Sequence, residues 1–396
     1  MLDCSVVGDV FAAPGAQRLF QALQLMDREA GILLVVLNHS GDVMSANMAC
    51  QLAARKGIKV KKLLTHDDIS AGIGANVDDR RGLAGCVPLY KILGAAAEEG
   101  KSLDELIEIG ERYNKNVATF IKEFKVQLPK GAHMDFIPGS YAQIKIPAFS
   151  MDYDKDIDKS LIGDEYLPAW QKFGLFPLKC VNTEPTVRAY SMANYPAEGD
   201  VFMLTVRIAT PPFKADRSGF MDVNPGIASS YIFTLKPGDK VIMSGPYGDF
   251  HPHFDSKKEM IWVGGGAGMA PLRAQIMHMT RTLNCRDREM HYFYGARALN
   301  EVFYLDDFHQ LEKDFPNFHF HLALDRPDPA ADAAGVKYTA GFVHQVMYNT
   351  YLKDHEAPED IEYYMCGPGP MSKAVVGMLD GLGVEPESIM YDNFGG

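Results

Sequence analysis

The segment Met260-Ile-Trp-Val-Gly-Gly-Gly-Ala-Gly-Met-Ala-Pro271 sets the fold of the last third of this 396-residue chain. Its apolar start, Met260–Val263, is typical of a strand buried on both faces of a parallel sheet. Glycines follow at once, and a helical pattern begins after them. A glycine-rich turn without a ligand is the alternative, but the flanking strand and helix favour a dinucleotide-binding loop. The predicted binding residues of this loop are Gly264, Gly265, Gly266 and Gly268.

Further apolar runs separated by helical patterns follow at His291–Tyr294, Phe318–Leu324 and Glu362–Met365. This alternation predicts a Rossmann-like α/β domain with a parallel sheet over residues 256–396. Ligands of such sheets collect at the carboxyl ends of the strands. The residues that follow these strand ends, and that we therefore expect at the ligand, are Arg297, Cys366, Gly367 and Pro368. A buried cysteine at a strand end is otherwise only a small apolar residue.

Residues 118–255 have a different pattern, with frequent Gly, Pro and aromatic residues. Short β-type runs at Tyr141–Ile146, Val201–Arg207 and Lys240–Ser244 predict an antiparallel β-barrel domain. A barrel followed by an open parallel sheet can hold two ligands at the junction of the two domains.

Two motifs within the predicted barrel suit a ligand that carries phosphates and a flat ring. In Arg188-Ala-Tyr-Ser191, the Arg fork suits a pyrophosphate, the Tyr190 ring can stack, and Ser191 offers a hydroxyl. The alternative is a plain strand with an outward Arg and an inward Tyr. Gly226-Ile-Ala-Ser-Ser230 can present a helix N-terminus to a phosphate, although a simple helix cap after Pro225 is the alternative.

Residues 1–117 alternate strand and helix patterns, which predicts an α/β domain with a parallel sheet. We expect strands at Ile32–Leu37 and Ile58–Leu64, a turn at Asn38–Asp42 and a helix from Met44 to Lys56. A second helix is expected over residues 87–99.

Composition limits the function classes. The formal net charge of −12 argues against general binding to nucleic acid or to an anionic membrane. The 6 cysteines show no C-x-x-C spacing, so we expect a reducing compartment and no disulfide, zinc or iron–sulfur site, and we name no metal ligand. No apolar run is long enough to span a bilayer, and no targeting segment is visible. We therefore expect the cytoplasm or an organellar matrix such as the mitochondrial one.

From about Ala118 to Gly396 the chain resembles the flavin- and NADH-binding part of the F subunit of the Na+-translocating NADH:quinone oxidoreductase. The stretches that carry the resemblance are Arg188–Pro196, Arg207–Pro212, Gly264–Pro271, Tyr351–Asp360 and Tyr363–Pro368. The resemblance implies the ferredoxin–NADP reductase fold, with FAD on the barrel and NADH on the Rossmann-like domain. By matching position, the residues implied to bind FAD are Arg188, Tyr190, Ser191, Asn194, Gly226, Ile227, Ser229 and Ser230.

The same resemblance implies an NADH-dependent flavoprotein oxidoreductase. NADH would bind at the Gly264–Gly268 loop, Arg297 and Cys366, and its hydride would pass to FAD beside Ser191 and Cys366. Phe394 would cover the flavin ring until the nicotinamide displaces it. The alternative is that the C-terminal residues form a flexible tail without this role. Glu301 near the expected ribose pocket would repel a 2′-phosphate and so favour NADH over NADPH.

The sequence specifies the route by which electrons leave the flavin less well than the route by which they enter. The F subunit of that enzyme also carries a membrane helix and a ferredoxin-like [2Fe–2S] domain with clustered cysteines, and we expect neither here. The electrons would then pass to an external acceptor, a protein or a quinone. The alternative is a non-catalytic structural or regulatory subunit of a larger, respiratory-type complex.

The N-terminal stretch resembles the middle of the dihydroxyacetone kinase substrate-binding subunit. Gly8–Ala12, Asn38–Met44, Gly82–Gly85 and Lys91–Gly100 carry this resemblance, and Asp42 matches the catalytic Asp. The substrate-capturing His and the nucleotide-binding domain have no counterpart, so phosphoryl transfer is not expected. We expect a scaffold through which the chain docks in a larger complex, with a triose-binding sensor as the alternative.

The junction at Asn114–Phe120 passes from the kinase-like stretch into the reductase-like one. Because Leu106–Tyr113 has a helical pattern, we predict that the barrel lacks its first strand. The N-terminal domain would cover the edge that this leaves.

Overall fold

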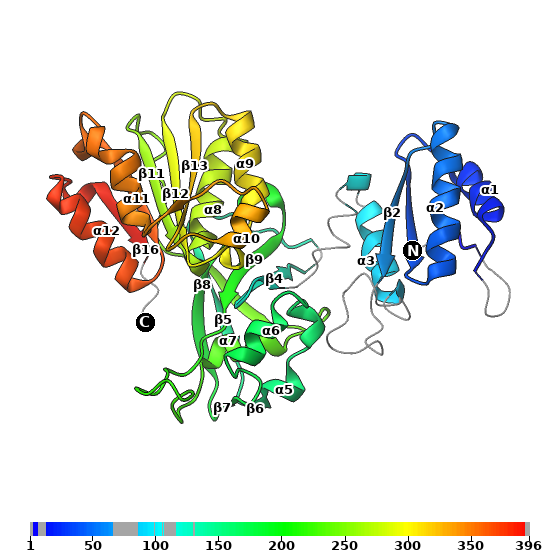
Figure 1. The fold of residues 1–396 in the computed structure, drawn as a ribbon, viewed down its shortest axis with the longest axis horizontal. Coiled ribbons are helices and arrows are strands. Elements are labelled where there is room, and N and C mark those ends of the chain that lie inside the picture. Colours follow the sequence, from blue (N-terminus) through cyan, green and yellow to red (C-terminus); the bar gives the residue numbers. More distant parts are fainter. Residues whose placement is uncertain are drawn as a thin grey trace. The chain divides into compact units, whose positions relative to one another are not determined.

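The computed structural model of the chain describes residues 3–6, 13–65, 86–98, 100–104, 106, 116–129 and 131–392. The chain divides into two compact units, Met1–Tyr113 and Asn114–Gly396, which are described separately (Figure 1). The division falls shortly before the boundary that we propose between residues 117 and 118.

The N-terminal unit contains a two-stranded parallel sheet between helices. Strands β1 (Ile32–Leu37) and β2 (Val60–Thr65) pair in register, from Ile32 opposite Val60 to Leu37 opposite Thr65. Side chains alternate between the two faces of a strand. Ile32 accordingly packs with the core of α1 and α2, whereas Leu33 and Val35 pack with the core of α3. The helices are α1 (Ala16–Met26), α2 (Ser40–Arg55) and α3 (Cys86–Glu98).

The predicted parallel α/β architecture of this unit is confirmed, but the turn predicted at Asn38–Asp42 is wrong. Helix α2 already begins at Ser40 and carries Asp42 in its first turn. An acidic side chain there is favourable because it interacts with the positive end of the helix dipole. The Gly-containing sequence therefore starts the helix rather than preceding it.

The second unit begins with two three-stranded antiparallel sheets and one two-stranded antiparallel sheet, β6-β7, as predicted for the FAD-binding barrel. One sheet has the order β3-β4-β9, the other has the order β10-β5-β8, and a bridge between Met192 and Leu204 connects them. The strands are β3 (Asn116–Ala118), β4 (Ile121–Gln127), β5 (Tyr141–Ile146), β6 (Phe149–Asp152), β7 (Lys179–Asn182), β8 (Thr186–Ser191), β9 (Val201–Arg207) and β10 (Ile242–Tyr247). The helices are α5 (Tyr153–Asp156), α6 (Leu167–Lys172) and α7 (Ile227–Thr234).

The predicted loss of a first barrel strand concerns a segment that is mostly outside the described residues. The three-residue strand β3 pairs with β4 immediately after that segment. Residues 107–115 are not described, so the helical expectation for Leu106–Tyr113 stays a prediction.

The last part of the chain forms a six-stranded sheet whose strands are all parallel, in the order β14-β13-β12-β11-β15-β16. Its strands are β11 (Met260–Gly265), β12 (Met290–Ala296), β13 (Phe318–Leu324), β14 (Thr339–Ala340), β15 (Glu362–Cys366) and β16 (Ile389–Asp392). Its helices are α8 (Met269–Met277), α9 (Leu305–Asp314), α10 (Pro329–Ala333), α11 (Val343–Thr350) and α12 (Gly369–Gly381). The predicted Rossmann-like fold is confirmed.

Alternate residues of each central strand reach opposite layers of this fold. Trp262 and Tyr292 pack in the core that includes α8 and α9, whereas Val263 and Phe293 pack in the core that includes α11 and α12. Strand β11 lies between β12 and β15, so the direction of strand succession reverses there. Ligands of open parallel sheets bind at the carboxyl ends of the strands at such a switch point.

Arg273 of α8 holds the barrel and the parallel sheet together. Its guanidinium donates to the Ala193 carbonyl at 2.9 Å and to Glu198 Oε1 at 2.8 Å, both on the barrel side. It also reaches Asp307 Oδ2 at 3.4 Å and lies over the Tyr304 ring. This buried network fixes the end of β8 against the carboxyl edge of the parallel sheet.

Candidate functional site

Ser191, Asp392 and Cys366 meet where the barrel contacts the parallel sheet. Ser191 ends β8 and is 2% exposed, and its Oγ donates to Asp392 Oδ2 at 2.6 Å. Asp392 ends β16 directly opposite Cys366 at the end of β15. The structure thus connects two predicted catalytic residues through Asp392, which the sequence analysis missed. The only local signal was an acidic residue in the C-terminal stretch after Met390.

The electrostatics of this corner favour neutral groups. Burial, followed by the nearby Asp249 carboxylate, raises the pKa of Asp392, and the hydrogen bond from Ser191 partly opposes that rise. Burial and the Asp392 carboxylate raise the pKa of the Cys366 thiol well above its ordinary value. Cys366 is therefore a protonated thiol near neutral pH, which excludes it as an activated nucleophile.

The predicted glycine loop packs directly on Cys366. Gly264 and Gly265 end β11, and a 3-10 turn over Gly266–Gly268 leads into α8. A Cβ on Gly268 would lie 2.1 Å from the Cys366 carbonyl oxygen, so only glycine fits there. The loop backbone is thereby held against the β15 end, which Gly367 and Pro368 continue toward α12.

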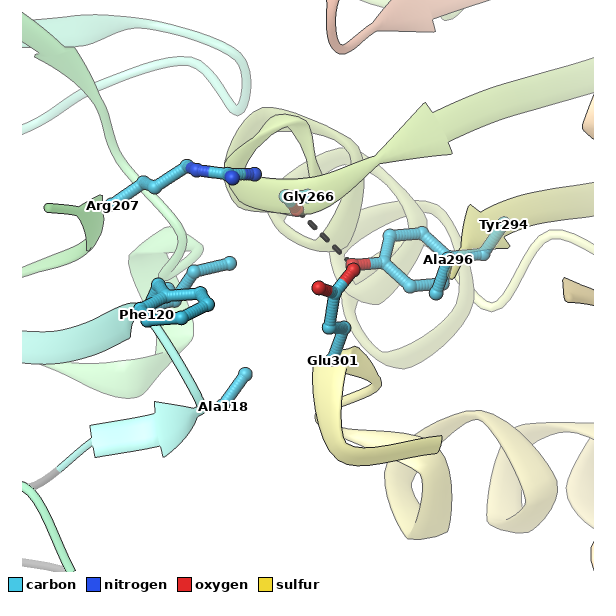
Figure 2. Close-up of a pocket in the computed structure, with 8 residues that line it drawn as sticks. Ala118, Phe120, Arg207, Gly266, Tyr294, Ala296 and Glu301 are labelled. Atoms are coloured by element: carbon cyan, nitrogen blue, oxygen red, sulfur yellow. Dashed lines mark hydrogen bonds between the residues drawn. The ribbon is translucent and has the colours of Figure 1, made fainter. Parts of the chain in front are cut away.

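A small pocket opens beside this loop (Figure 2). Arg207, at the end of β9, extends toward Gly266, and the Tyr294 hydroxyl donates to the Gly266 carbonyl at 3.2 Å. Partial desolvation and the nearby Arg297 lower the pKa of Arg207, while Glu301 opposes this effect. Arg207 is solvent-exposed, and a cation that can be reached from solvent beside a glycine-rich loop suits a phosphate group. Arg207 stood within a stretch that carried the family resemblance, but it was not predicted as a site residue.

Arg297 pairs with Glu301, one of the residues that line this pocket. Its guanidinium forms an ion pair with Glu301, whose Oε2 accepts from Nε at 3.0 Å. This hydrogen bond raises the pKa of Arg297. Because Arg297 neutralises Glu301, the carboxylate repels a nearby phosphate less than a free one would.

Arg188 and Tyr190 lie on β8, opposite Ile144 and Ala142 of β5. The Arg188 guanidinium is on the exposed side and donates to Thr186 Oγ1 at 2.9 Å. Tyr190 is partly buried, and burial raises the pKa of its phenol, so the ring stays neutral. An exposed Arg fork and a neutral aromatic ring on one strand fit the predicted FAD contacts.

The Gly226 loop is shaped by the two predicted serines. A Cβ on Gly226 would lie 2.5 Å from the Ala209 Cβ. Ser229 Oγ donates to the Gly226 carbonyl at 3.0 Å, and Ser230 Oγ donates to the same carbonyl at 2.7 Å. These hydroxyls hold the turn before α7. A phosphate would instead contact backbone N–H groups of the first helical turn, which begins at Ile227.

Asn194 also has a structural role. It is fully buried, and its amide nitrogen donates to the Val201 carbonyl at 2.6 Å while its oxygen accepts from the Met203 N–H at 2.9 Å. Both ends of the amide therefore hold β9 in place, and its contact with FAD stays a prediction. The predicted cover over the flavin, Phe394, lies outside the described residues.

Comparison with known proteins agrees with this geometry. A family model described as an oxidoreductase FAD-binding domain matches residues 172–251, and an oxidoreductase NAD-binding domain matches residues 262–377. The flavohem-like FAD/NAD-binding domain of nitric oxide dioxygenase from Vibrio cholerae O1 biovar El Tor shares the fold. It has a TM-score of 0.50 and 21% identity, over 72% of this chain and 97% of that one. The chain is thus a flavoprotein oxidoreductase with an FAD-binding and an NAD-binding domain.

Two curated relatives define the family. The F subunit of the Na(+)-translocating NADH-quinone reductase of Klebsiella pneumoniae is 50% identical over 283 residues, 72% of this chain and 66% of the relative. The F subunit from Methylococcus capsulatus is 48% identical over 285 residues, again 72% of this chain and 67% of the relative. The chain belongs to this F-subunit family and spans about two thirds of the length of these relatives. Both are bacterial proteins, which gives the mitochondrial location no support.

The N-terminal resemblance is confirmed as well, because a Dak1 domain model matches residues 1–136. This match extends past the division between the two units after Tyr113. Among the described helices, none is both long and apolar enough to cross a membrane.

Proposed function

We propose that this chain oxidises NADH at a bound FAD and passes the electrons to an external acceptor. The observation that carries the proposal is the contact of Ser191 from the barrel with Asp392, opposite Cys366, in the NAD-binding domain. When bound, NADH donates a hydride and FAD accepts it, which is chemistry that the cofactors supply. The protein must bring the two rings together at one place, and this corner joins the two domains.

The chain's own groups would align the two cofactors and shield the reacting atoms. Ser191 and Asp392 form a buried hydrogen bond that can hold a proton beside the reacting atoms, and the neutral Cys366 thiol adds no charge there. The Gly268 contact holds the loop at a set depth, and Arg207 offers a cation for a phosphate of the dinucleotide. Alignment of this kind contributes more to such a reaction than acid–base chemistry.

We infer a preference for NADH over NADPH that is weaker than an unpaired Glu301 would produce. Glu301 lines the pocket, but its carboxylate is already paired with Arg297. A Glu301→Gln variant tests this: the ratio of kcat/KM for NADH to that for NADPH should fall. An unchanged ratio would show that Glu301 does not contribute to the discrimination between NADH and NADPH.

We also infer that the acceptor is a quinone or a partner protein and that the N-terminal unit docks the chain in a larger complex. The relatives' name, which describes one subunit of an NADH-quinone reductase, supports a quinone acceptor and a larger complex. None of the six cysteines, all of which lie in the described part of the chain, forms a disulfide, and we propose a reducing compartment, the cytoplasm.

Flavin absorbance of the purified chain tests the central proposal. Anaerobic addition of NADH should bleach the flavin band within the mixing time, and reoxidation by a water-soluble quinone should restore it. A chain that binds FAD but is not bleached, or that holds no FAD, would support the alternative of a non-catalytic subunit. A parallel assay with ferricyanide as the electron acceptor distinguishes a failure to reduce quinone from a failure to oxidise NADH.

For the N-terminal unit we propose docking without kinase activity. Phosphoryl transfer needs substrate capture, metal and ATP together. Incubation with ATP, Mg2+ and dihydroxyacetone should yield no triose phosphate. Detectable product would contradict the proposal, and saturable binding of dihydroxyacetone alone would favour the triose-sensor alternative.

A further inference from the structure

Histidine and glutamate side chains gather at the amino ends of the central strands, at the edge opposite the glycine loop. Glu289 directly precedes β12, and His291 in β12 is the register partner of His319 in β13. Paired residues of neighbouring parallel strands point to the same face. The sheet therefore brings together two imidazoles that are distant in sequence, with a carboxylate beside them.

The three side chains have the spacing of a metal site. One potential ligand atom from each of Glu289, His291 and His319 lies within 4.8 Å of the other two. Glu289 Oε1 is 2.7 Å from His319 Nε2 and 3.6 Å from His291 Nε2. Ligands of a tetrahedral Zn2+ with bonds of about 2.0–2.1 Å lie about 3.3 Å apart. To reach that spacing, the Glu289–His319 pair would have to open by about 0.6 Å, which the two partly exposed side chains can do by rotation.

His291 presents an unsatisfied nitrogen to this position. The residue is 5% exposed, and its Nε2 is buried without a hydrogen-bond partner. Its Nδ1 lies 3.1 Å from His321 Nε2 and shares a proton with it. If Nδ1 carries the proton and donates it to His321, then Nε2 has a lone pair that accepts no hydrogen bond. If Nδ1 accepts from His321 instead, Nε2 carries a proton whose nearest acceptor, Glu289 Oε1, is 3.6 Å away, too far for a hydrogen bond. Either tautomer leaves a buried polar atom without a partner, which is costly.

We propose that Glu289, His291 and His319 bind a divalent transition metal of the Zn2+ class, with water as the fourth ligand. Imidazole and carboxylate ligands suit Zn2+, Co2+ or Ni2+. His321 would orient His291 through Nδ1, as second-sphere groups do in zinc sites. The Glu289 and His319 side chains are 43% and 41% exposed, which provides an entry path.

This site is separate from the cofactor corner, because it lies at the other end of the strands. It joins β12 to β13 and would stabilise the NAD-binding domain. The cysteine spacing that predicted no metal ligand has no bearing on a His and Glu site.

The test is a Co2+ and Zn2+ titration of the purified full chain after treatment with a chelator. We expect one metal per chain, Co2+ bands of nitrogen and oxygen ligation, and a melting temperature that rises with Zn2+. Glu289→Gln and His319→Gln, both at partly exposed positions, should each weaken binding at least about 10-fold. Circular dichroism and flavin content verify that these variants are folded.

His344→Gln is the matched control, since His344 is a partly exposed histidine of α11 outside the cluster. It should bind metal as the natural chain does. Three outcomes would each overturn the proposal. The first is the absence of stoichiometric metal binding, the second is that Glu289→Gln and His319→Gln bind metal as tightly as the natural chain, and the third is a thiolate charge-transfer band of bound Co2+. NADH oxidation by the metal-free chain is a separate readout, so failure here leaves the proposed function standing.

Discussion

Gly268→Ala should displace the dinucleotide loop from the end of β15. The added Cβ would lie 2.1 Å from the Cys366 carbonyl oxygen, 2.4 Å from its carbon and 2.7 Å from the Gly367 nitrogen. All three are backbone atoms, so no side-chain rotation relieves the clash. A carbon–oxygen contact needs about 3.3 Å, so the loop must move by about 1 Å. Overpacking of this kind costs about 1–3 kcal/mol.

A 1 Å misplacement of reacting groups can lower a rate about 100-fold. We therefore expect kcat/KM for NADH to fall by about that factor, with FAD content unchanged, in an NADH:ferricyanide assay. The melting temperature should fall by about 2–4 °C per kcal/mol lost. Gly369→Ala is the control, because its Cβ would meet nothing within 4 Å. A Gly268→Ala enzyme within about two-fold of the natural kcat/KM would show that the loop position does not limit the reaction.

Four further predictions concern the cofactor corner, the pocket beside the glycine loop and the domain contact. Ser191→Ala removes the hydroxyl that donates to Asp392, so the pKa of Asp392 should rise further. The acid limb of the pH profile of NADH oxidation should then move to higher pH, and an unmoved limb would exclude coupling between Ser191 and Asp392. Because the folded-state pKa of Asp392 is raised, the folded chain holds more protons than the unfolded one between the unfolded and folded pKa values. Its stability should therefore decline as pH rises through that window, and Asp392→Asn should flatten the decline in urea unfolding series. Arg207→Met should raise KM for NADH about 10- to 100-fold without loss of FAD. Arg273→Met removes the charged hydrogen bonds of Arg273 to the Glu198 carboxylate, which is partly exposed, and should cost about 1–3 kcal/mol, seen as a lower melting temperature. No shift in calorimetry would contradict that role.

Local patterns in the chain predicted the fold well because each depends on neighbours in sequence. The apolar run Met260–Val263 lies in β11, and the run Phe318–Leu324 is β13 from end to end. A strand buried on both faces requires such a run, so the pattern is diagnostic. Element ends were less predictable, as the start of α2 at Ser40 shows, because turn residues also serve as first-turn helix residues.

Side-chain roles depended on partners that local pattern does not show. Asn194 lies in a stretch that resembles an FAD-binding motif, yet its amide holds β9. The serines after Gly226 hold their own turn. A polar side chain in a motif can serve a ligand or the backbone, and only the position of nearby donors and acceptors distinguishes the two.

Local sequence was enough to predict the order of the domains and the glycine loop. These follow from composition, periodicity and backbone freedom, which act between near neighbours in the chain, whereas FAD and NADH were implied by the family resemblance. Two contacts emerged only in the folded chain: Ser191 with Asp392, 201 residues away, and His291 beside His319. Such contacts arise from domain docking and from the register of parallel strands, which are set by the packing of the whole core.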